Sequence, residues 1–492
     1  MAEILMSFER LAAVLGGRLV SFNPSIRGFS SVCIDSRKAG PGALFVALAG
    51  SVRNGHDYVE AAFRAGAAAA LVAESRLEPA LEDTARRAGA LLLTAADTLQ
   101  ALQQAAAAYL SGFPGLVRVG ITGSSGKTTT KEIAAAMIGA EKEVVINPGN
   151  YNSETGLPLA VFGVRSRHQV GIFEMGMNRR GEIGALAAVL RPHIALITNI
   201  GSAHIGIIGS REGIAQEKKA VFSAFTGTGL ALIPEDDEYR DFLARDLRGR
   251  PVFYGPRSCG ELGSIRELGL EGTELNWEGR PLRFGLPGAH NIKNALAAAA
   301  IAKAVPVGAA AIRRGLESVK PLFGRGEILR GSVTVVQDCY NANPESAAAA
   351  IRFCDAVFWP GRRIYIIGSM LELGTVSPEA HRELGRLLAV SRADMVFLYG
   401  TETAPARDML EAPPPDYSGL GAEAEVSGCV SSCRGRKVPC FYTGSIDVLS
   451  QAAADFVRPG DLVLLKGSRG CALERLAGRL LASAELPVQG GV

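Results

Sequence analysis

The stretch 117–133, which reads VRVGITGSSGKTTTKEI, constrains the fold of this chain more than any other. Apolar residues alternate over its first positions, which predicts a short buried strand, and the Ala-rich run 131–137 predicts a helix. A glycine turn lies between the two. Glycines let the backbone approach an anion closely, and successive N–H groups at a helix N-terminus supply partial positive charge. The order of strand, glycine loop, Lys-Thr and helix therefore predicts a phosphate-binding loop.

The residues of this loop have distinct expected roles. Gly123 and Gly126 leave room for phosphates, Lys127 can reach the terminal phosphates, and the Thr128 hydroxyl can ligate Mg²⁺. The pattern G-x-x-x-x-G-K-[ST] would need glycine where this chain has Ile121, so we interpret the loop as a shortened variant, Thr-Gly-x-x-Gly-Lys-Thr. The alternative, a glycine turn followed by a surface lysine, is disfavoured by the order of the neighbouring elements.

Length and composition restrict the class of protein. A chain of 492 residues is too long for one core, and about three domains are expected. The 52 basic and 49 acidic residues leave a net charge of +3, so bulk charge indicates no nucleic-acid partner. The uncharged runs 98–117 and 192–210 are interrupted by polar residues, Gly or Pro, and predict no membrane span. The N-terminus, with Glu3, Glu9 and Arg10, is unlike a signal peptide, and we expect a soluble cytoplasmic protein.

The eight cysteines do not suggest a disulfide scaffold in a chain of this length. Three of them lie singly in apolar surroundings and are expected in the core: Cys33, Cys339 and Cys354. Cys429, Cys433 and Cys440 have the spacing C-x3-C-x6-C and no fourth ligand nearby, which favours loop thiols over a zinc site.

Residues 1–95 predict a small mixed α/β domain, with a helix over 8–15 and short strands around 32–35 and 43–48. Polar residues gather in turns next to these strands, at Ser36, Arg37, Asn54 and His56. Such positions often hold a ligand in a small α/β domain, although capped turns with a solvated arginine would give the same pattern. The run 98–110 predicts a connecting helix.

From 96 to about 320, predicted strands and helices alternate, which indicates a mononucleotide-binding domain built on a mostly parallel sheet. One strand ends at Glu174, another leads to His204, and the helix after it carries Lys218. Ligands of open α/β sheets bind beyond the carboxyl ends of strands, so Glu174 and His204 are expected near the phosphate loop. A carboxylate there would suit Mg²⁺, although a lone glutamate is more often a cap and a lone histidine a core residue.

Two further segments of this domain have predicted features. Short strands with Gly and charged turns over 252–284 indicate a small antiparallel excursion. In GAHNIKNALAAAAIA, Asn291 and Asn294 open an Ala-rich helix, where their amides could bind the edge of a purine; the alternative for Asn291 is an N-cap.

Residues 321–492 predict a second doubly wound sheet, a C-terminal Rossmann-like domain without a dinucleotide fingerprint. Its strand ends carry Asp338 within DCYNANP, the segment GSMLELG over 368–374, and KGSRG over 466–470. The region 401–442 is rich in Pro, Gly and Cys and is expected to be irregular.

Taken together, these motifs resemble one family, the ATP-dependent Mur ligases of peptidoglycan synthesis. The resemblance covers nearly the whole chain and rests on motifs in family order: DSR with NGHD, TGSSGKTTTKE, EMGMNRRGEI, TNIGSAH, GAHNIKNALAA, GRGE, DCYNANP, GSMLELG and KGSRG. Two departures are Ser153, where a second Asn is expected in the Asn-rich loop, and Lys219-Ala220, where a small and then an acidic residue are usual.

The resemblance implies roles for individual residues. Those implied to bind ATP are Gly123, Ser124, Ser125, Gly126, Lys127, Thr128, Thr129, Asn291, Asn294, Arg325 and Asp338. Those implied to act in catalysis are Lys127, Glu174, His204, Lys218 and Arg325, and those implied to hold Mg²⁺ are Thr128, Glu174, His204 and Lys218. Lys218 matches a lysine that family members carry in N-carboxylated form. Ser36, Arg37, Asn54 and His56 match the end that holds the uridine nucleotide.

The family member most similar in its motifs joins D-alanyl-D-alanine to UDP-MurNAc-tripeptide. The resemblance therefore implies an ATP-dependent amide ligase that works through an acyl phosphate, releases ADP and phosphate, and uses ATP with two Mg²⁺ ions. We expect a monomer whose third domain closes onto the second. The main alternative is the sister ligase that adds the third amino acid; a folate-polyglutamate-type ligase, a P-loop kinase and a non-catalytic nucleotide-binding module fit the motifs less well.

Overall fold

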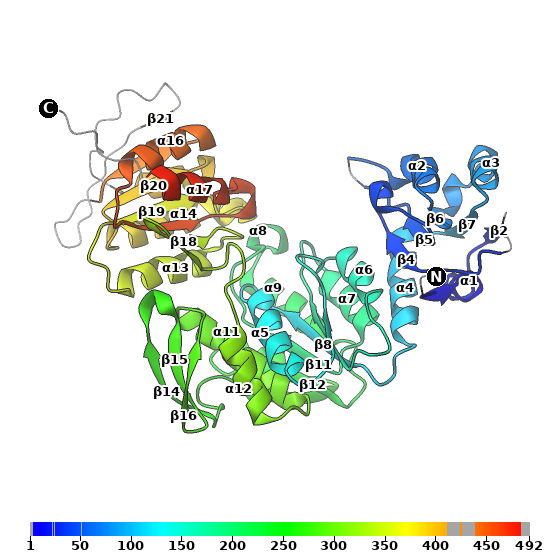
Figure 1. Ribbon diagram of the computed structural model, residues 1–492, viewed down its shortest axis with the longest axis horizontal. Helices are drawn as coiled ribbons and strands as arrows, with labels where there is room; N and C mark the ends of the chain where they lie inside the picture. Colours follow the sequence, from blue (N-terminus) through cyan, green and yellow to red (C-terminus); the bar gives the residue numbers. More distant parts are fainter. Residues whose placement is uncertain are drawn as a thin grey trace.

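The computed structural model describes residues 3–21, 23, 25–50, 52–410, 424–425 and 438–483. Figure 1 shows three bodies in chain order, with the N-terminal one at one end, the C-terminal one at the other, and the central one between them. Each contains its own main sheet, as the sequence predicts for a three-domain α/β protein. Among the described residues, no helix combines the length and the apolar character needed to cross a membrane.

The N-terminal body is built on a five-stranded sheet of order β2-β7-β6-β5-β4, in which only β2 runs antiparallel to its neighbour. Its strands are β2 (Leu19–Ser21), β4 (Ser31–Cys33), β5 (Ala43–Val46), β6 (Ala69–Ala73) and β7 (Leu91–Ala95). Its helices are α1 (Phe8–Leu15), α2 (Val59–Arg64) and α3 (Pro79–Ala88), and β1 (Met6–Ser7) pairs with β3 (Gly28–Phe29). The buried, nearly continuous apolar strands β5 and β7 are typical of a sheet covered on both faces.

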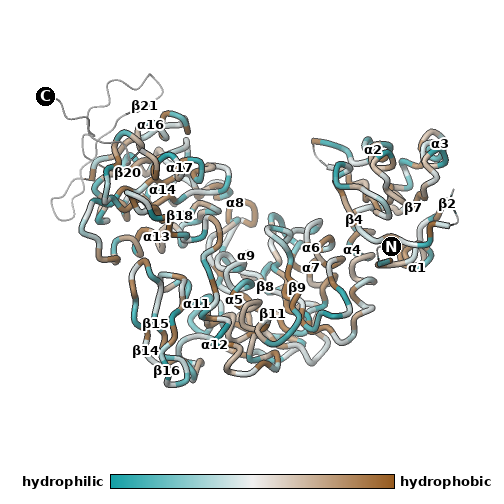
Figure 2. The backbone as a smooth tube through the Cα atoms, in the orientation of Figure 1, coloured by the Kyte–Doolittle hydropathy of each residue, from teal (hydrophilic) through white to brown (hydrophobic). Residues whose placement is uncertain are grey.

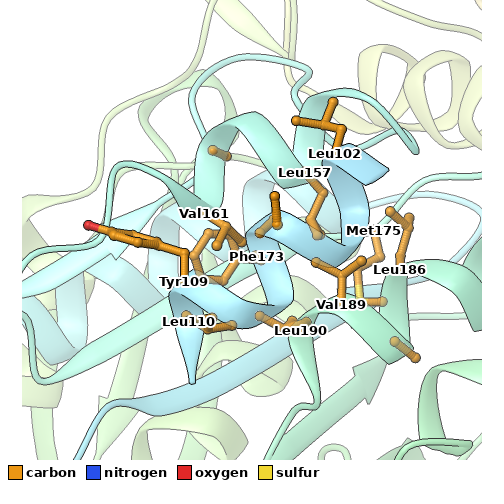
Figure 3. Close-up of a cluster of buried hydrophobic side chains, with 14 of the residues drawn as sticks. Leu102, Tyr109, Leu110, Leu157, Val161, Phe173, Met175, Leu186, Val189 and Leu190 are labelled. Carbon is orange, nitrogen blue, oxygen red and sulfur yellow. The ribbon is translucent and has the colours of Figure 1, made fainter. Parts of the chain in front are cut away.

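Helix α4 (Thr98–Leu110) connects this body to the central one, over the range that the sequence predicts. Its first turn is capped by Asp97, whose carboxylate accepts hydrogen bonds from two backbone N–H groups. Figure 3 shows Leu102 and Leu110 of α4 packed among Leu157, Val161 and Leu190 of the central body. The same buried cluster continues into the N-terminal body, where Phe8 and Phe29 belong to it.

The central body has a six-stranded, fully parallel sheet of order β13-β12-β11-β8-β10-β9, with β8 near its middle. Its strands are β8 (Val117–Thr122), β9 (Val144–Ile146), β10 (Val170–Glu174), β11 (Ile194–Ile197), β12 (Gly229–Pro234) and β13 (Gly249–Tyr254). Its helices are α5 (Lys127–Gly139), α6 (Gly156–Val161), α7 (Glu182–Leu190), α8 (Ile205–Ile208), α9 (Arg211–Lys219), α10 (Arg240–Ala244), α11 (Ala289–Ala304) and α12 (Ala309–Ser318).

The predicted bounds of two elements in this body were wrong. Helix α5 begins at Lys127, earlier than the predicted run from Lys131, because Gly126 in a left-handed conformation forms its N-cap. The antiparallel excursion is confirmed for β14 (Leu262–Glu267), β15 (Thr273–Trp277) and β16 (Arg280–Phe284), but residues 252–254 belong to β13 of the parallel sheet. Figure 2 shows hydrophilic stretches along β14 to β16, which explains why the turns there were easier to predict than the strands.

The C-terminal body has a seven-stranded sheet of order β17-β18-β23-β19-β20-β22-β21. Its strands are β17 (Glu327–Arg330), β18 (Thr334–Asp338), β19 (Arg363–Gly368), β20 (Met395–Tyr399), β21 (Ala424–Glu425), β22 (Cys440–Thr443) and β23 (Leu462–Lys466). Its helices are α13 (Pro344–Ala356), α14 (Ser377–Ala389), α15 (Ala404–Arg407), α16 (Ile446–Phe456) and α17 (Glu474–Ser483). The inner strands are parallel and the two edge strands antiparallel, with a buried cluster on each face, as a doubly wound sheet requires.

The cysteine predictions can be checked only in part. Cys33, Cys339 and Cys354 are buried free thiols, as expected of small core residues, and burial raises the pKa of the Cys339 thiol to about 12. Cys440 is buried within β22, whereas Cys429 and Cys433 lie outside the described residues.

Candidate active site

The glycine loop connects β8 to α5 at the carboxyl edge of the central sheet. Gly123 and Gly126 have φ values of +149° and +78°, which side chains of L-residues rarely adopt. A Cβ on Gly123 would also lie 1.8 Å from Thr198 Oγ1. Both glycines are therefore required by backbone conformation, as a phosphate-binding loop predicts.

The loop is held by the segment that follows β11. Thr198 donates its hydroxyl to Ser125 O at 2.6 Å, and the Ser125 N–H donates to Asn199 Oδ1 at 3.1 Å. Ser124 Oγ accepts a hydrogen bond from Gly201 N at 2.8 Å. Ser124 and Ser125 thus help to fix the loop within the chain.

Lys127 crosses the loop and donates its Nζ hydrogen bond to Gly123 O at 2.7 Å. Burial lowers the pKa of Lys127, as does the guanidinium of Arg325, while Glu174 opposes the change. An anion placed in the loop would favour the charged form of Lys127, which makes this lysine well suited to phosphate. Thr129, on the first turn of α5, is half-buried beside it.

Thr128 and Glu174 form the second part of the site. Thr128 donates its hydroxyl to Glu174 Oε2 at 2.6 Å, and Asn152 donates its amide to Glu174 Oε1 at 2.7 Å. The side-chain amide of Asn147 donates to Glu174 O and accepts from Glu174 N, which fixes the backbone there. Lys131 Nζ in turn donates a hydrogen bond to Asn147 O at 2.7 Å. Glu174 is therefore a buried carboxylate of fixed orientation, where the sequence predicts a ligand at the end of a strand.

Lys218 of α9 is almost completely buried, with 1% of its surface exposed. Two other lysines are equally buried but have partners: Lys131 contacts Asn147 O and Glu132, and Lys466 contacts Asp338 and a backbone carbonyl. In the part of the chain that the structure describes, no hydrogen bond or ion pair is formed by Lys218 Nζ. Burial, together with the nearby charge of Lys127, holds the pKa of Lys218 well below its usual range.

The C-terminal body contributes a cationic and aromatic group next to the loop. Arg325 stacks 4.1 Å above the ring of Tyr340, and its charge acts on Lys127 of the central body. Asp338, at the end of β18, pairs with the buried Lys466 at 2.8 Å. Because His290 at the start of α11 interacts electrostatically with Asp338, the two bodies face each other here.

Asn291 and Asn294 lie on the first turns of α11 and form a chain of amides beneath the glycine loop. Asn291 donates to Pro287 O at 2.8 Å, and Asn294 donates to Asn291 Oδ1 at 3.2 Å. The Asn294 oxygen lies against Gly126, where an added Cβ would approach it to 2.3 Å. Gly288, and not Asn291, is the N-cap of the helix. The predicted contact with adenine stays a prediction, and the contacts seen support the loop.

His204 is placed differently from the other predicted site residues. It precedes α8 with a φ of +65°, and its Nδ1 lies 2.8 Å from Glu372 Oε2 of the C-terminal body. The two atoms are in direct contact, with the N–H direction turned away from the alignment of a hydrogen bond. The structure thus brings Lys127, Thr128, Glu174, Lys218 and Arg325 together and places His204 on the boundary with the C-terminal body.

The predicted nucleotide-end residues lie at the carboxyl edge of the N-terminal sheet. Arg37 is largely exposed and forms a two-point ion pair with Asp35, whose pKa it lowers to about 2. Ser36 lies between them. Asn54 caps the following turn and contacts His56 Nδ1 at 2.8 Å, while His56 Nε2 accepts a hydrogen bond from the backbone N–H of Ala73, the last residue of β6. Both ring nitrogens of His56 have partners within the chain, whereas the guanidinium of Arg37 is largely open to solvent.

The donor set can be compared with the needs of Mg²⁺, which binds oxygen ligands and usually retains waters and substrate phosphates. Thr128 Oγ1 and Glu174 Oε2 are two such oxygens, already 2.6 Å apart beside the glycine loop. In the described ranges, no three His, Cys, Asp or Glu side chains converge into a ready cation cage. The residues fit an ion that takes most of its ligands from phosphate, water or a modified side chain.

Sequence reasoning missed several residues of the site. Asn152 and Asn199 lie in polar loops, and no role was predicted for them from the sequence. Glu345 and Glu372 lie in motifs of the C-terminal domain for which no contact with the central domain was predicted. The signal for the asparagines was present, since amides clustered beside glycines often bond loop backbone. Nothing local in the sequence marks the two glutamates as contacts between bodies.

Comparisons with known proteins agree with this geometry. Three family models match: the catalytic domain of the Mur ligase family over residues 29–110, the Mur ligase middle domain over 121–302, and the Mur ligase glutamate ligase domain over 324–469. A curated relative from Treponema pallidum, UDP-N-acetylmuramoyl-tripeptide–D-alanyl-D-alanine ligase, is 44% identical over 476 residues, covering 96% of this chain and 98% of its own length.

Solved structures show the same architecture. A crystal structure of MurF from Acinetobacter baumannii has a TM-score of 0.81 and 26% identity, and covers 98% of this chain and 99% of that chain. A structure of MurF ligase from Thermotoga maritima in complex with ADP has a TM-score of 0.75 and 26% identity, and covers 92% of this chain and 98% of that one. With a 44% identical relative matched over almost its full length, this chain belongs to the Mur ligase family.

Proposed function

We propose that this protein joins D-alanyl-D-alanine to UDP-N-acetylmuramoyl-tripeptide, with cleavage of ATP to ADP and phosphate. The observation that carries the proposal is the glycine loop with Lys127, Thr128 and Glu174 at one sheet edge and Arg325 reaching it from the C-terminal body. Relatives with this activity match the chain over almost its full length, which favours it over the sister ligase that adds the third amino acid.

The reaction needs activation of a carboxylate, which is a poor acyl donor. Transfer of the ATP γ-phosphoryl group to the carboxylate forms an acyl phosphate, and attack by the dipeptide amine then releases phosphate and forms the amide. Lys127 and Arg325 would neutralise charge on the moving phosphoryl group, and the loop N–H groups would hold the phosphates. The chain's task is positioning and charge neutralisation, since these steps need no serine or cysteine nucleophile.

Mg²⁺, when bound, would polarise the phosphoryl oxygens. Thr128 and Glu174 would hold one ion, with Asn152 fixing the carboxylate that faces it. His204 is proposed as a further ligand, together with Lys218 in modified form. We propose two ions in total, because the phosphoryl group and the acceptor carboxylate both carry negative charge.

N-carboxylation of Lys218 is supported by the environment of its amine. A buried ammonium without a partner is costly, so burial holds the pKa of Lys218 well below its usual range and favours the neutral, nucleophilic amine. Its lone pair can attack CO₂ to form a carbamate, with release of one proton. This reaction converts an unpaired amine into an anion that could ligate Mg²⁺, and the carbamate would then lie beside the side chain of Lys127.

The remaining assignments follow from the arrangement of the bodies. We propose domain boundaries at residues 95 and 320, the ends of the uridine-nucleotide domain and the ATPase domain. ATP would bind between the central and C-terminal bodies, with Asn291 and Asn294 on the adenine side and Asp338 at the ribose. Ser36, Arg37, Asn54 and His56 would hold the uridine nucleotide. We propose a cytoplasmic monomer, in which closure of the C-terminal body completes the site.

The test is phosphate release from ATP and Mg²⁺ with UDP-MurNAc-tripeptide, with and without D-alanyl-D-alanine. We expect release only with both substrates, and its loss in Lys127→Ala but not in Lys142→Ala, a lysine next to the end of α5 and away from the loop. Release that ignores the dipeptide but accepts UDP-MurNAc-dipeptide with a diamino acid would assign the sister activity. Release that needs neither substrate would indicate a nucleotide hydrolase instead.

A further inference from the structure

The central and C-terminal bodies meet at a contact that includes the proposed metal ligand His204, whose neighbours there have no role in the proposed chemistry. It joins the segment 201–206, which follows β11 and begins α8, to the loop 371–374 and the start of α13. Figure 1 shows α8 at this boundary between the bodies. Because the segment 201–206 contains His204, the contact lies next to a proposed metal ligand.

The two backbones touch directly at this contact. Gly206 N donates to Glu372 O at 3.3 Å, and a Cβ on Gly206 would lie 2.3 Å from Gly374 N. A Cβ on Gly374 would in turn lie 2.6 Å from the Cα of Gly206. Only glycine fits at either position, so the two loops are docked closely enough to fix the position of Glu372 relative to His204.

Both side chains that meet here extend from strained backbone. His204 and Glu372 have φ values of +65° and +66°, a conformation that residues other than glycine rarely adopt. Residues in such conformations cluster at functional sites, where surrounding structure over-determines them. Of the His204 side chain, 16% is exposed, and its Nδ1 lies 2.8 Å from the Glu372 carboxylate.

We infer that Glu372 is a positioning residue, which holds the Nδ1 side of His204 so that Nε2 is the nitrogen presented to a metal ion. A metal-binding histidine usually directs its other ring nitrogen to a carboxylate, which fixes the tautomer and the ring orientation. The carboxylate here comes from another domain, so binding of the ion at His204 would depend on docking of the C-terminal body. This inference rests on the metal role proposed for His204.

A second contact of the same boundary provides a matched control. Glu345 at the start of α13 accepts a hydrogen bond from Ser202 N at 2.9 Å and one from Ser202 Oγ at 3.0 Å. It joins the same two bodies within the same segment, but it does not touch His204. Loss of Glu345 should therefore remove one contact of the boundary while the backbone contact at Gly206 and Gly374 and the partner of the histidine remain.

The experiment titrates Mn²⁺, a paramagnetic substitute for Mg²⁺, into the full chain with ADP and follows free Mn²⁺ by electron paramagnetic resonance. His204→Gln defines the histidine-dependent site. We expect Glu372→Ala to weaken that site about 10- to 100-fold, Glu372→Gln to weaken it less, and Glu345→Ala to change it less than about twofold. In the His204→Gln background, Glu372→Ala should have no further effect.

A second readout follows the histidine itself. In chains labelled with ¹⁵N-histidine, the resonances lost in His204→Gln identify its ring, and they should report the Nδ1–H tautomer in the parent and a mixture in Glu372→Ala. If His204→Gln weakens Mn²⁺ binding and Glu372→Ala does not, the inference is overturned while the role of His204 stands. If Glu345→Ala matches Glu372→Ala, docking alone is responsible and the inference is likewise overturned. If His204→Gln leaves Mn²⁺ binding unchanged, the proposed metal role of His204 fails.

Discussion

Replacing Gly126 by alanine should destabilise the central body by about 2 to 5 kcal/mol, from two separable sources. The first is the backbone, because a φ of +78° costs an L-residue roughly 1–2 kcal/mol. The second is the new Cβ, which would lie 2.3 Å from Asn294 Oδ1 and force that side chain to turn. A buried amide that loses its partners costs about 1–3 kcal/mol.

Asn294→Ala separates the two sources. On its own it removes the 3.2 Å hydrogen bond to Asn291 Oδ1, at about 1–2 kcal/mol. In the double variant Gly126→Ala/Asn294→Ala, the new Cβ no longer meets the Asn294 side chain. Gly126→Ala then adds only its backbone cost to the loss caused by Asn294→Ala. The double variant should therefore be more stable, by about 2 kcal/mol, than the sum of the single losses predicts.

The assay is calorimetric unfolding of the full chain together with ADP titration. A loss of 1 kcal/mol corresponds to about 2–4 °C for a domain of 150–250 residues, so Gly126→Ala should lower the transition of the central body by roughly 10 °C. ADP binding should weaken in parallel, because the loop N–H groups would shift. Additive losses in the double variant would refute the close contact with Asn294, and an unchanged transition in Gly126→Ala would refute the strained loop.

Three further substitutions probe the contacts that support the site. Asn152→Ala removes the 2.7 Å hydrogen bond to Glu174 and should raise the Mg²⁺ concentration needed for phosphate release about 10- to 100-fold, with UDP-MurNAc-tripeptide affinity unchanged. His56→Ala removes two hydrogen bonds and should lower the free energy of unfolding of the N-terminal body by about 2 kcal/mol, measured by denaturant titration. An unchanged free energy of unfolding would mean that the His56 ring does not stabilise the fold and is free to contact substrate. The pKa of Lys218 is lower in the folded chain than its usual value of 10.5. At a pH between these two pKa values, the Lys218 amine is protonated in the unfolded chain and neutral in the folded one. In CO₂-free buffer the free energy of unfolding should therefore rise with pH across this window. Lys218→Met should reduce this rise and leave the part that comes from the lowered pKa of Lys127, and a variant with the same rise as the parent would contradict the lowered pKa of Lys218.

Much of the fold could be predicted because the sequence marks the ends of its elements clearly. The helices over 98–110 and 8–15 have the predicted bounds, since Asp97 caps the first and Ser7 caps the second. The start of α5 was harder, because three consecutive threonines have low helix propensity and tertiary packing overrides it. The strand β13 was missed as part of the parallel sheet, because its residues are largely exposed at the sheet edge.

The candidate site could be predicted where one loop or one strand end carries the residue. Lys127, Thr128 and Glu174 met at one sheet edge because parallel strands end together. The partner of His204 could not be predicted, because Glu372 is distant in the sequence and reaches it only through docking of two bodies. Nor does local pattern show that Lys218 lacks a partner, since that depends on every element packed around α9.

The hydrophobic cluster around α4 has a consequence for how the chain can be divided into fragments. Phe29 of the N-terminal body packs edge-on against Phe162 of the central body, at 5.8 Å between ring centroids, within one continuous buried cluster. A cut near residue 95 would expose this cluster to water on both sides, and neither piece should be soluble when expressed alone. The C-terminal sheet has a buried cluster on each of its faces, so a fragment starting near Glu327 should retain its fold. Proteases should therefore release two stable pieces from the chain, although it contains three sheets with helices packed on them.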